Sequence, residues 1–473
     1  MDSRPLLISN ATVFDATGGP ARPNTSILIE EGRIAAVTPA AGQGTHDGAT
    51  LIDGTGKFVI PGLIDMHVHV ELSGGEDALP AWLGTGVTSV RDVGGAPANL
   101  IPLRDAINAS TKTGPRVFTY GPLLDGTPPI FGAAAGALAP RGGIDPGSLT
   151  WTIADAATAE QAVDELIARG VDGFKLYAGL RPDLVRAFLE RIDGRLPVTG
   201  HLSRTWASEA IEMGINCLEH VHATIYQDVV PPEFRHPREE GNGFIPNYWT
   251  WLNTGWANAD LGADYVKRFV ELLVSRGVAL SPTTVLITGG MATREALDEP
   301  GLKYTPRGLT QRRAAQMEQA RRLREEAEKA GRPLPPPMAL EGADAETGQR
   351  ARAKQLEFLS MVYEAGGTVV PSTDVGAAPN QVPGFSLHRE LALFAEAGIP
   401  NAAVIELATR HAARVLRKDD ELGTLAPGKR ADLLLLTKDP LADIHNTRAI
   451  EAVVKDGVAY APQPLLERAV AGG

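Results

Sequence analysis

The chain of 473 residues is 43% hydrophobic and 22% charged, a composition that supplies enough apolar material for a globular core. Its net charge of −12 argues against nucleic acid and against an anionic membrane surface as partners. The single cysteine, Cys217, excludes an intramolecular disulfide framework, and no apolar run reaches the about 18 residues of a membrane-spanning helix. Because the start of the chain shows no targeting segment, we expect a cytoplasmic protein.

The two ends of the chain share one texture. Residues 1–60 hold short segments in which apolar and polar positions alternate, separated by Gly and Asn/Asp turn signals, as in a small antiparallel sheet. Residues 423–473 repeat this texture, and the stretches EEGRIAAV and KDGVAYAP both read as hairpins. We therefore predict that the two ends meet as one small, discontinuous β-sandwich domain.

The middle of the chain, residues 61–422, alternates short strand-like segments with helical ones. This is the pattern of repeated βα units and a parallel sheet. Eight strand-like segments follow one another, from GLIDMHVHV to TVVPSTDVG, and eight is the number of strands in a closed (β/α)8 TIM barrel. We predict this α/β barrel, with a doubly wound open sheet as the competing architecture.

Two segments exceed what a minimal barrel needs. Residues 227–262 are rich in Pro, Gly, Asn and Trp, and residues 289–350 hold a charged helical stretch followed by PLPPP. Both follow a predicted strand, where long loops shape or cover an active site. Surface decoration explains the charged helix equally well. A lid or an interface is favoured for the aromatic cluster of the first segment, which comprises Tyr248, Trp249, Trp251 and Trp256.

Candidate metal ligands stand at the ends of several predicted strands. His67 and His69 are one residue apart on a strand, so both rings face the same side, and imidazole is a common zinc ligand. Alone, this pair is a weak signal, because two ordinary histidines at this spacing are common. The pattern becomes strong because other strands also end in candidates, at the face where barrel active sites lie. These candidates are Lys175, His201, His220 with His222, and Asp374.

With these residues the chain resembles the amidohydrolase superfamily, specifically its members with two metal ions and a carboxylated lysine. The resemblance extends over nearly the whole chain, through GKFVIPGLIDMHVH, TSVRDVGG and LGTLAPGKRADLLLL, followed by DPLADI and VVKDG. The branch of imidazolonepropionase-related proteins and Xaa-Pro or Xaa-Arg/Lys dipeptidases is the most similar one. Members of that branch hydrolyse amide bonds.

The resemblance implies a site with two divalent metal ions. His67 and His69 would bind the more buried ion together with Asp374, and His201 and His220 would bind the more exposed one. We favour His220 over His222 at the sixth strand, because EH after an apolar strand matches the family pattern. Zinc fits imidazole and carboxylate ligands best, although manganese, cobalt or iron would also suit them.

The resemblance also assigns roles to Lys175 and Asp374. Lys175 would bridge both ions as an N6-carboxylated lysine formed with carbon dioxide, since an ammonium group cannot ligate a cation. A lysine held beside two cations is pushed toward the neutral amine that reacts with carbon dioxide. An ordinary salt-bridging lysine is the alternative. Asp374 would accept a proton from the attacking water and deliver it to the leaving amine.

Further polar residues near the strand ends are candidates for weaker roles. Asp65 is expected either to orient a metal ligand or to bond the backbone at the end of its strand. Four residues are candidates for contact with the substrate, and packed or solvent-facing side chains are the alternative for each of them. They are His222, Tyr177, Tyr226 and Arg204.

Together these patterns predict a binuclear amidohydrolase that cleaves a carbon–nitrogen bond in a small amide or peptide substrate, such as a dipeptide or an N-acyl amino acid. Hydrolysis of a cyclic amide, a lactone or another ester is the alternative, because the fold does not select among these substrates. A non-catalytic binding or scaffold protein would be expected to lose metal ligands, and here all six positions are filled. The sequence also leaves room for a homo-oligomer.

Overall fold

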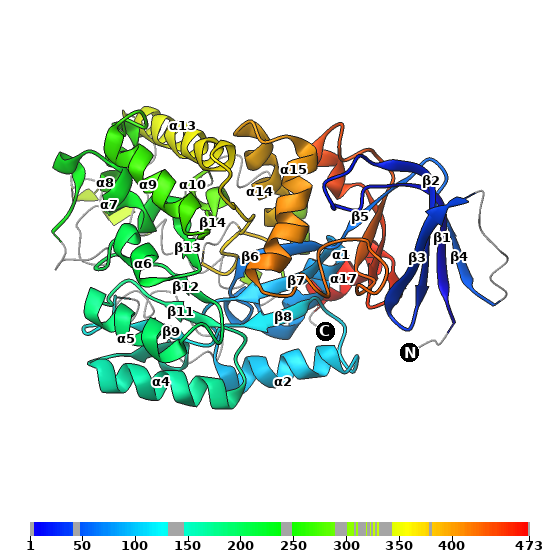
Figure 1. Ribbon diagram of the computed structural model, residues 1–473, viewed down its shortest axis with the longest axis horizontal. Coiled ribbons are helices and arrows are strands. Elements are labelled where there is room, and N and C mark those ends of the chain that lie inside the picture. Colours follow the sequence, from blue (N-terminus) through cyan, green and yellow to red (C-terminus); the bar gives the residue numbers. More distant parts are fainter. Residues whose placement is uncertain are drawn as a thin grey trace.

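The computed structural model describes residues 4–40, 48–130, 146–237, 248–288, 300–306, 309–310, 343–377 and 381–471, with single positions between 318 and 330. Its strands lie in three sheets, and helices surround the two parallel ones (Figure 1). The mixed α/β class predicted from the sequence is therefore confirmed. Most of the charged stretch in the 289–350 insertion, and the PLPPP segment after it, lie outside the described residues.

Strands from both ends of the chain form one sheet, at the right of Figure 1. Its order is β17-β16-β15-β5-β1-β2-β3, and β4 pairs with β1. β15 runs antiparallel to β5, with Leu433 opposite Pro61. The strands are β1 (Leu6–Val13), β2 (Arg22–Glu30), β3 (Arg33–Pro39), β4 (Thr50–Asp53), β5 (Phe58–Pro61), β15 (Leu433–Leu436), β16 (Ile450–Lys455) and β17 (Val458–Tyr460).

Alternating side chains explain why this sheet forms. In β1 the residues Leu6, Ile8 and Val13 are buried, and they share an apolar cluster with Leu433 and Leu435 of β15. The two ends of the chain thus meet in one sheet, as their shared texture predicts. The sandwich architecture and the domain limits at residues 60 and 423 stay predictions.

The strands between these ends form two parallel sheets. One has the order β6-β7-β8 and the other β10-β9-β11-β12-β13-β14. Parallel sheets are usually covered by helices on both faces, and β6 and β7 are accordingly buried along their whole length. The strands are β6 (Leu63–Val68), β7 (Val87–Asp92), β8 (Arg116–Thr119), β9 (Leu123–Asp125), β10 (Thr150–Thr152), β11 (Phe174–Leu176), β12 (Val198–Gly200), β13 (Cys217–Glu219) and β14 (Ala279–Ser281).

The stretch Val369–Val375 connects the two parallel sheets. An isolated parallel bridge joins Val369 to Leu280 of β14, and another joins Val375 to Val68 of β6. The stretch therefore lies between the last strand of the longer sheet and the first strand of the shorter one. The described parallel strands form two sheets linked in this way, and the closed eight-stranded barrel stays a prediction.

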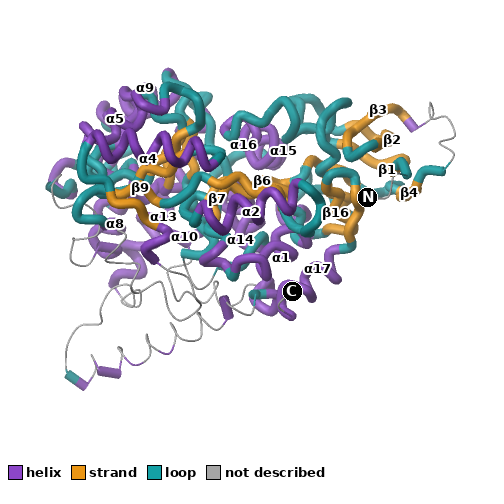
Figure 2. The backbone as a smooth tube through the Cα atoms, turned by 90° about the horizontal axis from the view of Figure 1, so that it is seen from below, coloured by secondary structure: helices purple, strands orange, loops and turns teal. Residues whose placement is uncertain are grey.

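Helices lie on both sides of the parallel strands (Figure 2). Helix α4 illustrates how the sequence sets their limits: the Asp155 carboxylate accepts the Thr158 N–H at its start, and Gly170 ends it with a φ of 87°. The helices are α1 (Leu79–Gly84), α2 (Pro97–Asn108), α4 (Ala156–Arg169), α5 (Pro182–Ile192), α6 (Ala207–Met213), α7 (Tyr226–Val229), α8 (Tyr248–Ala257), α9 (Asp264–Ser275), α10 (Thr284–Thr288), α13 (Ala343–Glu364), α14 (Phe385–Glu396), α15 (Asn401–Glu406), α16 (Ala412–Val415) and α17 (Pro462–Ala471).

No helix within the described ranges combines the length and the apolar character needed to cross a bilayer. The cytoplasmic location stays a prediction.

Helix α8 anchors the described part of the 227–262 insertion in the core. Trp256 is fully buried, and its Nε1 donates a hydrogen bond of 2.9 Å to the carbonyl oxygen of His222. The Trp251 ring packs against the Tyr226 ring with centroids 4.1 Å apart. These contacts are not those of surface decoration. A lid or interface role for the aromatic cluster stays a prediction.

A buried ion-pair network joins the three-stranded sheet to the strands from the end of the chain. Arg116, at the start of β8, donates to the Asp432 carboxylate at 2.6 Å and to the Asp456 carboxylate at 2.5 Å. The side chains of Arg116 and Asp432 are each only 7% exposed. Removing one member would leave a buried charge without its partner, which is costly.

We expect Asp432→Asn, which keeps the shape but removes the charge, to lower the free energy of unfolding by about 3 kcal/mol. Urea denaturation measures this change. The matched control is Asp164→Asn, because the pair of Asp164 with Arg191 lies on the surface with both side chains more than 40% exposed. The control should leave the midpoint unchanged, and equal losses in both variants would contradict a special role for the buried pair.

Candidate metal centre

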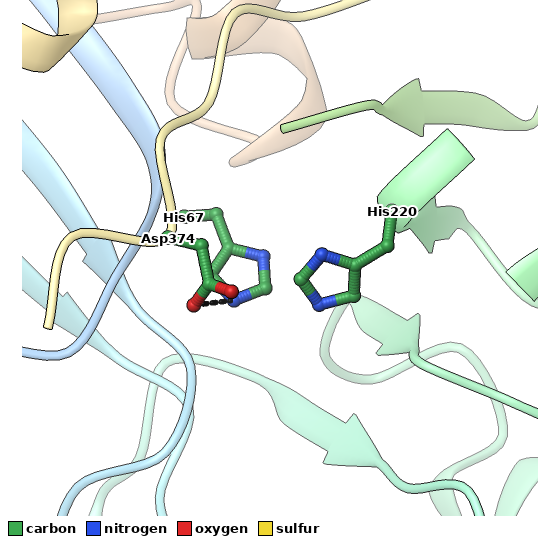
Figure 3. A group of neighbouring side chains, drawn as sticks. All are labelled: His67, His220 and Asp374. Atoms are coloured by element: carbon green, nitrogen blue, oxygen red, sulfur yellow. Dashed lines mark ion pairs between the residues drawn. The ribbon is translucent and has the colours of Figure 1, made fainter. Parts of the chain in front are cut away.

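Three of the predicted ligands converge in the interior. His67, His220 and Asp374 each place one ligand atom within 4.8 Å of the others, and all three are buried (Figure 3). His67 lies on β6, His220 directly follows β13, and Asp374 lies in the stretch that pairs with β6. One Asp374 oxygen, Oδ1, lies 3.2 Å from Nε2 of His67 and 3.0 Å from Nε2 of His69.

The other two predicted ligands lie at the same place. The His201 ring, which follows β12, has its centroid 4.4 Å from that of His220. Lys175 of β11 is 1% exposed, and within the described part of the chain its Nζ has no hydrogen-bond partner; neither has Nε2 of His201. Buried polar atoms without partners are rare in native proteins and point to a missing ion or ligand. The donor set therefore fits a metal centre.

The backbone at this site is strained. His220 and Asp374 both have a φ of +57°, in the left-handed region that residues other than glycine rarely adopt. Such conformations persist only where the surroundings fix them, and they gather at functional sites. For Asp374 the fixing contact is its N–H, which donates to the His67 carbonyl oxygen at 2.8 Å. The strain thus turns both side chains toward the shared spot.

The electrostatics put the cluster in the protonation states that bind cations. Burial, with the charge of Lys175 nearby, holds the pKa of His201 and of His220 well below the usual value, so both imidazoles are neutral at pH 7. Burial also lowers the pKa of Lys175 to about 8. For Asp374 burial acts in the opposite direction, yet His67 and His69 keep its pKa far below the normal range. Neutral imidazoles and an anionic carboxylate are the ligand forms.

Two residues at the site, Glu219 and Arg91, were missed in the sequence. The carboxylate of Glu219, the last residue of β13, lies 2.7 Å from Nδ1 of His67, and Arg91 of β7 donates to it at 2.6 Å. Burial alone would raise the pKa of Glu219, but the charges of Arg91 and Lys175 hold it well below normal. The sequence signal that could have identified them is a charged residue within an otherwise apolar strand, as in TSVRDVG and CLEHVHA.

Asp65 forms its hydrogen bonds with Thr373 and with the backbone of His67, rather than with the ring of a candidate metal ligand. Its carboxylate accepts the Thr373 N–H at 3.1 Å and the Thr373 hydroxyl at 2.7 Å, and it also accepts the backbone N–H of His67 at 3.3 Å. Burial raises its pKa to about 7. These contacts favour the backbone-bonding interpretation, and they fix the residue that directly precedes Asp374.

The candidates for substrate contact are placed unequally. The Tyr177 ring lies 4.9 Å from the His201 ring, and the His222 ring lies 5.5 Å from the His220 ring, so both adjoin the cluster. Tyr226 is 1% exposed and packs on Trp251. Arg204 donates to the carbonyl oxygens of two backbone positions, Thr127 and Gly179. Contact with a substrate stays a prediction for all four.

Known proteins share parts of this sequence and the whole of this fold. Residues 261–459 match the amidohydrolase family. A 5'-deoxyadenosine deaminase of Methanothermobacter thermautotrophicus is 43% identical over 88 residues, which are 18% of this chain and 19% of that relative. The chain thus matches less than a fifth of the relative's length.

Two solved structures superpose over nearly the full length. Bottromycin amidohydrolase does so with a TM-score of 0.71 at 22% identity, covering 99% of this chain and 91% of its own. A Xaa-Pro dipeptidase with bound methionine in the active site gives a TM-score of 0.65 at 19% identity, covering 97% of this chain and 100% of its own.

At such identities the structural matches show the fold, and the family match reaches from α9 through Asp374 to the last strands. The predicted enzyme class, a hydrolase acting on carbon–nitrogen bonds, agrees with these relatives. The resemblance seen in the sequence agrees with these comparisons: residues 261–459 match the amidohydrolase family, and the fold as a whole is similar to that of solved amidohydrolase and dipeptidase structures.

Proposed function

We propose that the protein is a binuclear metal-dependent hydrolase that cleaves a carbon–nitrogen bond of a small substrate. The observation that carries the proposal is the convergence of four imidazoles, one carboxylate and one buried lysine at the ends of parallel strands. Apart from the site, the bridges made by Val369–Val375 support closure of the two parallel sheets into a barrel, whose active face is formed by these strand ends.

The residues divide into two sets of ligands. His67, His69 and Asp374 would hold one ion, because Asp374 Oδ1 already lies close to Nε2 of both histidines. His201 and His220 would hold the other, since their rings are neighbours. Bound divalent ions would supply a water of lowered pKa and polarise the scissile carbonyl. Zinc is the ion we favour, because it suits imidazole and carboxylate ligands.

Lys175 would join the two sets after N6-carboxylation. Its amine is buried, has no hydrogen-bond partner in the described part of the chain, and has its pKa lowered to about 8 by burial. A fraction of the amine is therefore neutral at pH 7, and the neutral form adds carbon dioxide to give an anionic ligand. Asp374, which is anionic at pH 7, would accept a proton from the water and pass it to the leaving amine.

The hydroxyl of Thr283 determines which ring nitrogen of His220 carries the proton. Its hydroxyl lies 2.8 Å from the Pro282 carbonyl oxygen, to which it donates, and 2.8 Å from Nδ1 of His220. A hydroxyl has one proton to donate, so here it accepts from Nδ1. His220 is then protonated on Nδ1, which leaves Nε2 free to bind a cation. Ligand histidines commonly have such a partner.

The substrate class is chosen from the relatives. The similarity in fold to a Xaa-Pro dipeptidase and to an amidohydrolase supports a dipeptide or an N-acyl amino acid. The partial match to a deaminase supports hydrolytic removal of an amino group as the second candidate. Opening of a cyclic amide or lactone uses the same chemistry, and a panel containing all these substrates separates them.

Removing a ligand should abolish turnover. We expect His67→Ala and Asp374→Ala each to reduce activity to background and to lower the metal content while the protein stays folded. The control is His445→Ala, which removes an exposed histidine whose ring pairs with Asp443 and should leave both quantities unchanged. Full activity in either site variant would mean that the ligands are assigned wrongly.

Metal content also tests the role of Lys175. The wild-type protein, purified without chelator, should carry about two equivalents of a transition metal by plasma mass spectrometry. Lys175→Met should bind fewer equivalents, and the carbon-13 NMR carbamate signal obtained with labelled bicarbonate should vanish. Lys455→Met, at a buried lysine that pairs with Asp456, is the matched control. Equal metal content in all three proteins would exclude Lys175 as a ligand.

The hydrogen bond of Thr283 is tested by a pair of variants. Thr283→Val keeps the shape but cannot accept from His220, so we expect metal affinity to fall about tenfold or more. Thr283→Ser retains the hydroxyl and should bind metal nearly as well as the wild type. Competition with a chromophoric chelator measures both affinities. Equal losses in the two variants would indicate a packing effect instead.

A further inference from the structure

We propose that Glu219, held in place by Arg91, is a positioning residue that fixes the His67 ring in the tautomer whose Nε2 is free to bind metal. The proposal rests on the proposed function, because it takes His67 to be a ligand. Neither residue reaches the shared spot of His67, His220 and Asp374; both would act through the imidazole.

The contacts of Glu219 assign one oxygen to each task. Oε1 accepts from Arg91 at 2.6 Å and from the Thr199 hydroxyl, whereas Oε2 lies 2.7 Å from Nδ1 of His67. A carboxylate can only accept hydrogen bonds, so Nδ1 must carry the proton. The opposite nitrogen, Nε2, lies 3.2 Å from the Asp374 carboxylate, so without a metal ion it can carry a proton as well. When the Nε2 proton is lost, Glu219 keeps the remaining proton on Nδ1 and leaves Nε2 free to bind an ion.

Arg91 supplies the rigidity that this arrangement needs. Its Nε donates to the carbonyl oxygen of Met66 at 2.5 Å while its Nη2 binds Glu219, and its guanidinium lies over the Tyr120 ring. The guanidinium therefore ties the backbone next to His67 to the carboxylate that bonds the His67 ring. A planar group with donors in fixed directions suits this two-point contact, and lysine does not.

The position of the pair makes a simple packing role insufficient. Arg91 and Glu219 are both fully buried, and an ion pair inside a protein often stabilises it no more than apolar side chains of similar size would. Apolar side chains in place of the pair would not provide a hydrogen-bond acceptor for Nδ1 of His67. Partners of this kind orient ligand histidines at metal sites, and their loss typically lowers metal affinity about 10–100-fold.

The informative variant is Glu219→Gln. The amide must donate with one end, so it cannot accept both from Arg91 and from His67 as the carboxylate does. If its NH₂ group faces His67, Nδ1 becomes the acceptor and the ring proton moves to Nε2, where it blocks the metal. If its oxygen faces His67, two donors confront each other at Arg91.

The experiment observes the tautomer directly. Metal-free full-length protein labelled with nitrogen-15 histidine is studied by long-range proton–nitrogen NMR, with His67→Gln identifying the His67 signals. At a pH high enough for the His67 ring to be neutral, we expect the Nδ1–H form in the wild type and a shift toward the Nε2–H form in Glu219→Gln. Metal affinity of the same proteins, from chelator competition, should fall about 10–100-fold in Glu219→Gln.

The matched control is Asp432→Asn, which removes a buried carboxylate from an arginine pair away from the site. It should change neither the His67 tautomer nor the metal affinity, even if it lowers stability. An Nε2–H tautomer in the wild type overturns the proposal, as do an unchanged tautomer and affinity in Glu219→Gln.

Two complications are separable. If Glu219→Gln does not fold, the proposal is still tested by the wild-type tautomer and by Thr199→Val, which removes one contact to Glu219. An Nε2–H form in the wild type refutes the proposal. If the wild type shows the Nδ1–H form but binds no metal, the proposed function fails while the assigned hydrogen bond stands.

Discussion

The arrangement of the candidate site depends on balancing charged side chains that are buried in an apolar interior. Lys175, Arg91, Glu219 and Asp374 all lie buried among parallel strands, where an unpaired charge would be very costly. Arg91 and Glu219 neutralise each other, and the Asp374 carboxylate lies against Nε2 of His67 and of His69. Lys175 is left with a lowered pKa.

The sequence was sufficient to group the six candidate ligands because their signal is their position at strand ends. A histidine or an aspartate that follows a buried strand stands out from its apolar neighbours, and parallel strands end on one side of a sheet. The order of residues alone is therefore enough to group His67, His69, Lys175, His201, His220 and Asp374, and the fold brings all six together. The meeting of the two chain ends followed from their shared alternation.

The supporting residues could not be found in this way. Arg91 and Glu219 lie within strands, and each is explained only by its partner on another strand. The role proposed for Thr283 depends on the distances from its hydroxyl to Nδ1 of His220 and to the Pro282 carbonyl oxygen. The sequence does not give these distances. The aromatic residues of the 227–262 insertion favour a lid or an interface, and the burial of Trp256 depends on packing that composition does not encode. The sequence pattern does not give the distances between residues on different strands, and these residues are recognised from such distances.

The pairing of β5 with β15 has a consequence for biosynthesis. Until β15 leaves the ribosome, β5 has an open edge on the side that Leu433–Leu436 will occupy, although β1 can already pair with its other side. Open strand edges favour association with other chains. The parallel strands in between are synthesised earlier, so this sheet can be completed only after them. Nascent chains halted before β15 should therefore be the species that chaperones and proteases recognise.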